Sequence, residues 1–273
     1  MSAEWKPTLL HLDHGSAAGA PQDAAALLTA LVDGSVPVIV LRGLFDPATV
    51  TANRESAESL FHTARTTRYA NGSLTTVGPY LAKYLREPDV YFDEAERAQK
   101  LLADSGFDLT ARTRAALREL LGLRGFEPAV QPDGRQYAEQ NVRIYPVGHE
   151  TPLHNDDMRR DAAGTGLVLA DLACHLSCVV CIQECEEGGE LEVYRRKWSA
   201  DDQRFTTPGM LGYDPAVVAG VPVHRYKPHT GDVYLLNPTH YHAIGRVGGR
   251  DRVTMGFFFG FFDGARTDAV SWV

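Results

Sequence analysis

Two histidines and one aspartate in the second half of the chain have the types and spacing of metal ligands. Only Asn155 separates His154 from Asp156, so on a strand the side chains of His154 and Asp156 point to the same side while Asn155 points away. His242 lies far downstream, and Arg252 follows it by ten residues. Two imidazoles and one carboxylate on one face of an ion leave the opposite face open, as in non-haem Fe(II) sites that activate oxygen. The pattern predicts such an iron centre.

The third ligand has a competitor, because His240 and His242 share a strand face. We favour His242, since the spacing to Arg252 allows one strand, a turn at Gly248-Gly249 and a return strand that brings Arg252 beside the ion. His240 is then expected to lie at the rim of the substrate pocket or to pack inside the protein.

A cation and a hydroxyl alternate at the start of the last apolar run. Arg252 and Thr254 fall on one face of the predicted strand. A guanidinium can hold a carboxylate with two parallel hydrogen bonds, so the pair is suited to the far carboxylate of a keto-acid cosubstrate.

Four cysteines lie between Cys174 and Cys185 and resemble a cluster-binding series. On a strand, however, Cys174 and Cys178 face one side while Cys181 and Cys185 face the other, so four thiolates cannot meet on one metal. We predict small buried apolar residues with free thiols, as is usual in a reducing compartment.

Composition narrows the class of partner. The formal net charge is -8 and the pI is near 5.7, and the longest basic run is Arg195-Arg196-Lys197, which predicts no nucleic-acid binding. No apolar stretch approaches the roughly 18 residues of a membrane span, and residues 1–15 lack a signal-peptide pattern. We expect a cytoplasmic protein that acts on a small molecule; the sequence does not indicate an oligomeric state.

The chain is predicted to be mainly β with a helical N-terminal part, in a single domain of residues 1–273. Residues 1–127 form a mostly helical elaboration with one early strand at 36–41 and a loop at 65–76. Caps at Asp23 and at Asp46-Pro47 begin the first two helices, and Gly34 ends the first. The predicted helices cover residues 24–32, 47–61, 80–85, 91–104 and 109–121.

Glycines and prolines at 125–134 mark a connection, after which the period becomes strand-like. Eight short strands with glycine turns predict a double-stranded β-helix, a cupin-like jelly roll, as the core of residues 128–273, flanked by α-helices. The predicted strands cover residues 141–147, 152–156, 174–182, 190–194, 221–227, 232–236, 240–247 and 252–262.

With these pieces in order, the second half resembles the Fe(II)/2-oxoglutarate-dependent dioxygenases. It is most similar to the carrier-independent halogenases and hydroxylases of the hapalindole-type alkaloid group, which act on free small molecules. The similarity rests on the metal ligands and on residues 145–148, 188–194, 231–232, 241–242 and 252–257, and more weakly on 132–137. It implies Fe(II), 2-oxoglutarate and O2 as cofactors, with His154, Asp156 and His242 on the metal.

The resemblance also implies that Arg252 and Thr254 bind the C5 carboxylate of 2-oxoglutarate. Many relatives of the prolyl hydroxylase type add a tyrosine from the third strand, but residues 177–182 contain none. We therefore expect Tyr145 to assist, and another keto acid stays open as cosubstrate.

Asp156 departs from the halogenases of that group, in which a small residue replaces the carboxylate and the freed position takes halide. The resemblance then implies hydroxylation of an unactivated C-H bond of an amino acid or natural-product intermediate, with succinate and CO2 as co-products. Desaturation and ring closure are alternatives. So is a cupin-like metalloenzyme that uses no keto acid, in which Arg252 would be an ion-pair partner of Asp251 or Asp232. A non-catalytic binding module is the third hypothesis.

The substrate pocket is predicted from position alone. Asn141 and Arg143 share a strand face with Tyr145, Met158 follows the ligand strand, and Tyr80 lies near the loop at 69–76. With His240 these residues are the candidates for the wall. An inward-facing Arg143 would indicate a carboxylate or phosphate on the substrate.

Overall fold

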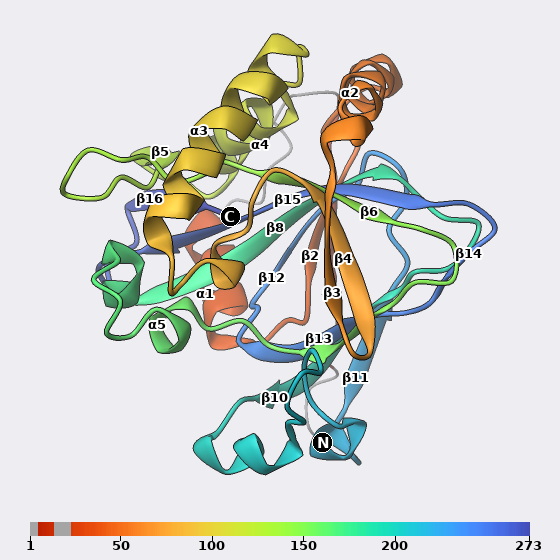
Figure 1. Cartoon of the computed structure of the whole chain (residues 1–273), viewed down its shortest axis with the longest axis vertical. Helices are drawn as coiled ribbons and strands as arrows, with labels where there is room; N and C mark the ends of the chain where they lie inside the picture. Colours follow the sequence, from red (N-terminus) through yellow and green to blue (C-terminus); the bar gives the residue numbers. More distant parts are fainter. Residues whose placement is uncertain (1–4, 14–22) are drawn as a thin grey trace.

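Two sheets face each other, and helices cover the outer face of the larger one, in the computed structural model of the chain (Figure 1). The structure describes residues 5–13 and 23–273, so part of the predicted N-terminal stretch 1–15 lies outside the described residues. The architecture is mainly β and is the predicted jelly roll flanked by helices.

The large sheet takes its strands from both halves of the chain. Its strands, in spatial order, are β1 (Thr8–His11), β2 (Ile39–Arg42), β12 (Val233–Leu236), β8 (Cys174–Gln183), β15 (Arg252–Phe261), β6 (Asn141–Tyr145), β4 (Gly72–Val77) and β3 (Arg65–Tyr69). Strand β16 (Asp268–Trp272) pairs with β15 and with β5 (Gly125–Pro128). Because β2 from the N-terminal part pairs with β12, and β5 pairs with β16 near the C-terminal end, we propose that residues 1–273 fold as one unit.

The second sheet carries the predicted ligand strands. Its order is β11 (Val223–Tyr226), β10 (Leu191–Lys197), β13 (His240–Ile244) and β7 (Thr151–His154). Strands β9 (Glu187–Gly188) and β14 (Val247–Gly248) pair with each other in a separate two-stranded sheet. Val179 and Tyr234 of the large sheet pack against Leu191 and Val193 of the small one, so the two inner faces share one buried cluster.

The helices pack on the opposite face of the large sheet. Helices α1 (Ala24–Asp33) and α4 (Leu109–Leu120) bury leucines in the same cluster as Phe257 and Phe259 of β15 (Figure 1). Helix α2 (Pro47–Ser59) adds Ala57 to this cluster, and α3 (Pro88–Asp104) adds Leu102. The predicted caps are confirmed: Asp23 accepts from Ala26 N–H at 2.8 Å, and Gly34 ends α1 with φ of 76°. No helix in the described ranges is long and apolar enough to cross a membrane.

Successive side chains of the long central strands β8 and β15 alternate between the helix-covered face of the sheet and the inner face. Met255 pairs with Val180, and both belong to the cluster under the helices. Thr254 pairs with Arg143 on one side and Cys181 on the other. Paired residues of antiparallel strands share a face, so these three side chains face the small sheet. A polar strip therefore runs along the inner face of an otherwise apolar sheet.

Three local predictions were wrong. Residues 65–76 form the hairpin β3–β4 and not a loop, because Thr75 and Thr76 of β4 find partners on β6, some 70 residues away. The predicted helix at 80–85 is a single 3-10 turn, Leu81–Lys83, and the connection at 125–134 contains β5. The small helix α5 (Met158–Asp161) and the strand β16 were not predicted at all.

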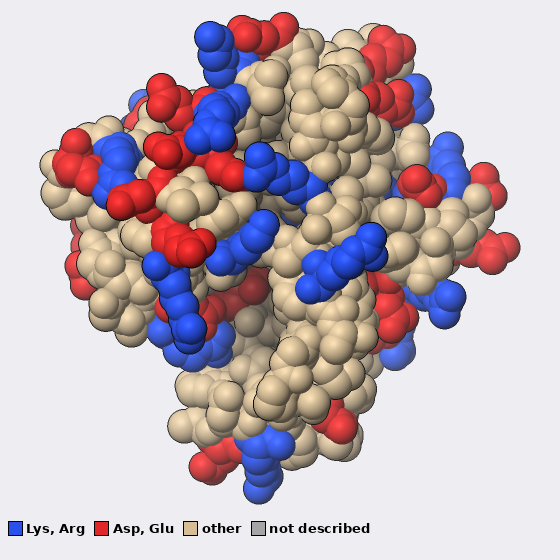
Figure 2. All heavy atoms as spheres, viewed as in Figure 1, with Lys and Arg blue, Asp and Glu red and all other residues tan. Residues whose placement is uncertain are grey.

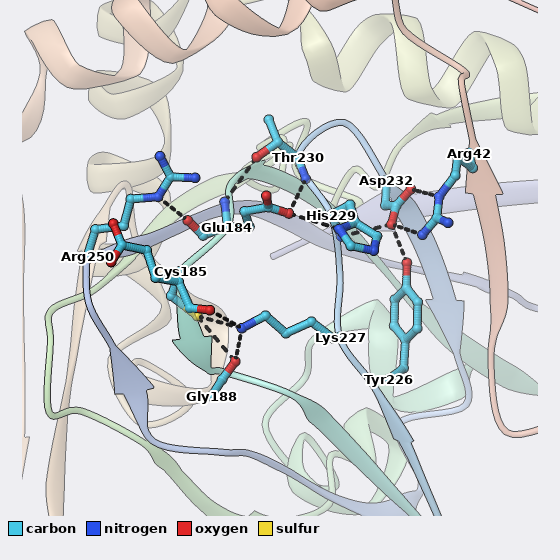
Figure 3. Close-up of polar contacts among 11 residues, drawn as sticks. Arg42, Glu184, Cys185, Gly188, Tyr226, Lys227, His229, Thr230, Asp232 and Arg250 are labelled. Carbon is cyan, nitrogen blue, oxygen red and sulfur yellow. Dashed lines mark hydrogen bonds and ion pairs between the residues drawn. The ribbon is translucent and has the colours of Figure 1, made fainter.

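A buried carboxylate ties the N-terminal strand β2 to the jelly roll. The Asp232 side chain is 2% exposed and accepts two hydrogen bonds from Arg42, each of 2.8 Å, one from the Tyr226 hydroxyl at 2.5 Å and one from His229 N–H at 2.9 Å (Figure 3). Burial raises the pKa of Asp232, but these partners outweigh it and the pKa lies below its ordinary value.

Arg42→Ala is expected to lower the free energy of unfolding by about 3 kcal/mol, because it leaves a buried carboxylate without its cation. Urea unfolding of the metal-free protein measures this. The matched control is Arg112→Ala, which removes the exposed ion pair with Asp108 and should cost no more than about 0.5 kcal/mol. Equal losses in the two variants would contradict the assigned role of Asp232.

Candidate metal centre

The three predicted ligands meet at one edge of the small sheet. His154, the last residue of β7, pairs directly with His242 of β13, and Asp156 follows two residues after His154. Asp156 Oδ2 lies 3.6 Å from His242 Nε2 and 3.9 Å from His154 Nε2. One ligand atom from each residue lies within 4.8 Å of the other two; among the described residues no other trio of His, Cys, Asp or Glu converges in this way.

Both imidazoles are oriented for metal binding. His154 Nδ1 lies 2.8 Å from the Pro152 carbonyl oxygen, and His242 Nδ1 lies 2.9 Å from the His240 carbonyl oxygen. Since a carbonyl only accepts, each Nδ1 carries the hydrogen and each Nε2 keeps a free lone pair. Carbonyl partners of this kind fix the tautomer of metal-ligating histidines. The donor set therefore fits Fe(II).

The charge states at neutral pH also suit a metal. Burial, together with the neighbouring His154, lowers the pKa of His242 to about 4, so its ring is neutral. Burial raises the pKa of Asp156, but His154, His242 and Arg143 more than offset this and hold the pKa below its ordinary value. A neutral imidazole and an ionised carboxylate are the forms that bind metal.

The metal-free protein should lose stability between pH 6.5 and about 4. Between these pH values His242 is protonated in the unfolded chain, where its pKa is the ordinary 6.5, but it stays neutral in the folded chain. Above pH 6.5 His242 is neutral in both states and the free energy of unfolding is undiminished. As the pH drops from 6.5 to about 4, the free energy of unfolding falls by up to about 3 kcal/mol. Urea unfolding at several pH values tests this, and His242→Asn should flatten the slope; an equally steep slope in that variant would contradict the assignment.

His240 lies outside the metal-binding group. Its ring stacks on Trp5 with ring centres 6.0 Å apart, and its Nδ1 faces the Tyr194 carbonyl oxygen at 3.0 Å. It also abuts Gly34, where an added Cβ would lie 2.3 Å from His240 Nε2. The structure thus places His242, and not His240, with the other ligands.

The cysteines follow the predicted parity. Cys178 belongs to the cluster under the helices and Cys174 packs against it, whereas Cys181 pairs with Thr254 on the inner face. Cys185 lies in a separate cluster with Tyr145 and Val247. All four thiols are free.

Arg252 and Thr254 lie on the inner face of the large sheet, and each has one buried polar atom without a hydrogen-bond partner. Arg252 is 2% exposed, its Nη2 donates to the Tyr234 hydroxyl at 2.7 Å, and its guanidinium lies 5.1 Å from the centre of the Tyr145 ring. Arg252 Nε and Thr254 Oγ1 are buried without a hydrogen-bond partner. Such groups are costly unless a ligand satisfies them, and a carboxylate would satisfy both.

The two carboxylates that might have paired with Arg252 are engaged elsewhere. Asp232 binds Arg42 (Figure 3), and Asp251 accepts from Val147 N–H at 2.9 Å. In the part of the chain that the structure describes, Arg252 forms no ion pair. It is therefore a buried cation that is free to meet an anionic ligand.

Tyr234 was missed by the sequence reasoning. It supplies from β12 the phenol that the third strand lacks, and burial raises its pKa to about 12, so the hydroxyl stays protonated. Since it accepts from Arg252, its own hydrogen is free to donate. A signal was present in the sequence, because Tyr234 shares a strand face with Asp232 and Leu236 on a predicted strand. Nothing in the sequence, however, places that strand near Arg252.

The glycine pair 188–189 lets the chain pass close to this arginine. Gly189 has φ of 68°, and an added Cβ there would lie 2.4 Å from Cys185 Sγ and 3.3 Å from Arg252 Cδ. An alanine would be strained at this φ, would clash with Cys185 Sγ and would crowd the Arg252 side chain.

The predicted pocket residues fall at two places around the metal-binding group. Tyr80 and Met158 line a small cavity with Asp156, and the Tyr80 hydroxyl lies 2.9 Å from that of Tyr69. Asn141 is fully buried and accepts from Arg143 Nε at 3.1 Å. Arg143 lies opposite Thr254 on the inner face of the large sheet, and its charge helps to hold the pKa of Asp156 below its ordinary value. Figure 2 shows that the side of the molecule turned to the viewer has a recess with acidic atoms inside it and basic side chains around it.

The fold, the three metal ligands and the buried Arg252 are those of an Fe(II)/2-oxoglutarate-dependent oxygenase, whose cofactors are Fe(II), 2-oxoglutarate and O2. The model of one family, carrier-protein-independent halogenase WelO5, matches residues 9–267, and the chain belongs to that family.

Known proteins agree with this assignment. Leucinostatins biosynthesis cluster protein S of Purpureocillium lilacinum is 24% identical over 178 residues, which cover 63% of this chain and 71% of that protein. The fold is similar to that of an N-substituted L-amino acid dioxygenase from Burkholderia ambifaria AMMD in complex with alpha-KG, with a TM-score of 0.59 and 16% identity over 92% of this chain and 91% of that one. The carbocyclase SnoK from nogalamycin biosynthesis gives a TM-score of 0.57 and 14% identity, over 92% and 88%.

Proposed function

We propose that this protein hydroxylates an unactivated C-H bond of a free small molecule, an amino acid or a natural-product intermediate, and forms succinate and CO2 from 2-oxoglutarate. The observation that carries the proposal is Asp156, whose carboxylate lies 3.6 Å from His242 Nε2. A carboxylate at this place fills the third protein position of the metal, where the halogenases of the family would bind halide. Desaturation and ring closure need the same site and differ only in the product.

In this proposal His154, Asp156 and His242 hold Fe(II), which together with 2-oxoglutarate and O2 supplies an oxidant that removes hydrogen from carbon. Arg252 and Thr254 bind the C5 carboxylate of 2-oxoglutarate, the Tyr234 hydroxyl donates to it, and the Tyr145 ring covers the guanidinium. Arg252, Thr254 and Tyr234 would thus fix the orientation of the cosubstrate, and Tyr145 would hold the arginine in place.

Arg143 adds a second cation, close to the metal. It lies opposite Thr254 on the neighbouring strand, so it faces the cosubstrate side of the cavity. We propose that it contacts an anionic group bound beside the iron, and that Asn141 holds its guanidinium in place.

The absence of an ion-pair partner for Arg252 among the described residues favours this function over a cupin-like enzyme that uses no keto acid. In such an enzyme the buried cation would need a protein carboxylate, and Asp232 and Asp251 are both engaged elsewhere.

The test is anaerobic reconstitution with Fe(II) and 2-oxoglutarate, followed by oxygen. We expect a visible absorption band from the metal and cosubstrate, then succinate in proportion to the 2-oxoglutarate consumed. His154→Ala should abolish both. If no band and no succinate form, or if His154→Ala binds iron as tightly as the wild type, the proposed function is wrong.

The proposed setting is the cytoplasm. Four free thiols suit a reducing compartment, where Fe(II) also persists. The proposed partner is a small molecule, because the substrate-side cavity is a narrow recess and the net charge is negative.

A further inference from the structure

Two buried polar atoms without a partner lie on residues that line the cavity beside Asp156. His175 of β8 is 3% exposed and Trp272 of β16 is fully buried, and neither His175 Nδ1 nor Trp272 Nε1 has a hydrogen-bond partner. We propose that these two atoms bind a hydroxyl group of the substrate and so anchor it beside the iron. This inference rests on the proposed function and names the chemical group that the substrate must carry.

The cavity is built by neighbouring strands at the end opposite the cosubstrate. Phe258 of β15 pairs with Trp272, and the two rings stack with centres 6.0 Å apart. The His175 ring centre lies 5.9 Å from that of Trp272 and 6.2 Å from that of Phe258. Arg252 begins β15 and Phe258 lies six residues later, so the proposed cosubstrate-binding arginine and the aromatic wall of the cavity lie at different ends of the same strand.

The hydrogen-bonding roles of the two nitrogens are determined. His175 Nε2 lies 3.2 Å from the Asp156 carbonyl oxygen, so this nitrogen carries the hydrogen and Nδ1 of the neutral ring is an acceptor. An indole nitrogen is a donor only. The cavity therefore presents one acceptor and one donor, each buried at a cost that a matching ligand would remove.

A hydroxyl group matches this pair best. It donates one hydrogen bond to His175 and accepts one from Trp272, and the cavity, of about 30 Å³, has room for a single small group. A carboxylate would meet the lone pair of His175 and the carboxylates of Asp156 and Asp161, which also line the cavity. An ammonium group would leave the indole N–H unsatisfied.

Asp156 belongs both to the metal-binding group and to the wall of this cavity. A hydroxyl held here would place the carbons next to it near the iron, so the subsite would select the position that is oxidised as well as the substrate.

Four probes that differ only in the end group test the proposal: benzyl alcohol, benzyl methyl ether, toluene and benzoate. Dissociation constants are measured anaerobically from the change of the absorption band of the protein loaded with Fe(II) and 2-oxoglutarate. Wild type is expected to bind benzyl alcohol about 30-fold more tightly than toluene, from two hydrogen bonds of roughly 1 kcal/mol each, and about fivefold more tightly than benzyl methyl ether, which accepts from Trp272 but cannot donate to His175. Benzoate is expected to bind more weakly than the alcohol. Trp272→Phe and His175→Phe each remove one of the two hydrogen bonds and should reduce the preference for the alcohol over toluene to about fivefold.

The chain offers matched controls. Trp198 Nε1 and His224 Nε2 are also buried without partners, but neither residue lines this cavity. Trp198→Phe and His224→Phe should keep the wild-type preference, and circular dichroism checks that each variant is folded.

Equal binding of the alcohol and toluene, tighter binding of benzoate, no binding of the alcohol, or an unchanged preference in Trp272→Phe would each overturn the inference. An ordered water that stays between the two nitrogens when the alcohol is bound would overturn it as well. If the wild-type protein forms no absorption band, the result contradicts the proposed function and not the hydroxyl-binding subsite. The two failures are therefore distinguishable.

Discussion

Asp156→Ala is expected to lower the rate of hydroxylation by about 100-fold or more, because it removes the only charged ligand from a three-residue metal site. The remaining imidazoles are held to carbonyl oxygens and keep their orientation, so the loss would report the carboxylate itself. The measurement is the rate of product formation in single-turnover experiments, with succinate followed in parallel. The control is Asp157→Ala, which removes the neighbouring carboxylate, an ion-pair partner of Arg159, and should change the rate by no more than about threefold.

Asp156→Gly goes further, since it also opens space next to the metal. Halide is expected to perturb the absorption of the loaded Asp156→Gly variant and not that of the wild type. The backbone N–H of residue 156 donates to the Pro238 carbonyl oxygen and is retained in the variant, so the chain should keep its path. Wild-type hydroxylation in either variant, or halide binding to the wild type, would contradict the role that we assign to Asp156.

The ligand set could be predicted because it depends on short-range geometry. One residue separates His154 from Asp156, and this spacing alone places both side chains on one side of an extended segment. The structure ends β7 at His154, so Asp156 reaches the group from the following turn and not from the strand. The choice between His240 and His242 was harder, since it required the pairing of β13 with β7, which brings His242 opposite His154.

Residues that depend on long-range pairing escaped prediction. Tyr234 meets Arg252 only because β12 and β15 both flank β8, and Trp272 reaches the cavity only because β16 pairs with β15. His175 looks like any strand-end histidine in the sequence. The threonine-rich hairpin β3–β4 was taken for a loop because its partner, β6, lies far along the chain. Local patterns determine an element, but the register between distant strands determines which side chains meet.

Arg252→Lys is expected to raise the KM for 2-oxoglutarate by about 30-fold or more while kcat changes little, because the C5 carboxylate is bound alike in the ground and transition states. Lysine keeps the charge but offers a single point of contact, and it cannot both donate to Tyr234 and bind a carboxylate along two bonds. Tyr234→Phe removes one neutral donor and should raise the KM by about fivefold.

Arg250→Lys is the matched control for this series. Arg250 lies two residues away, and its Nε donates to the Glu184 carbonyl oxygen at the surface, away from the buried pair (Figure 3). Its replacement should leave the KM within about twofold of the wild type. A fall in kcat with an unchanged KM in Arg252→Lys would mean that the arginine acts on the reacting centre and not on the distal carboxylate. Because Arg252 is buried and its Nε has no partner, removing it should also abolish the rise in melting temperature that 2-oxoglutarate gives to the metal-loaded protein.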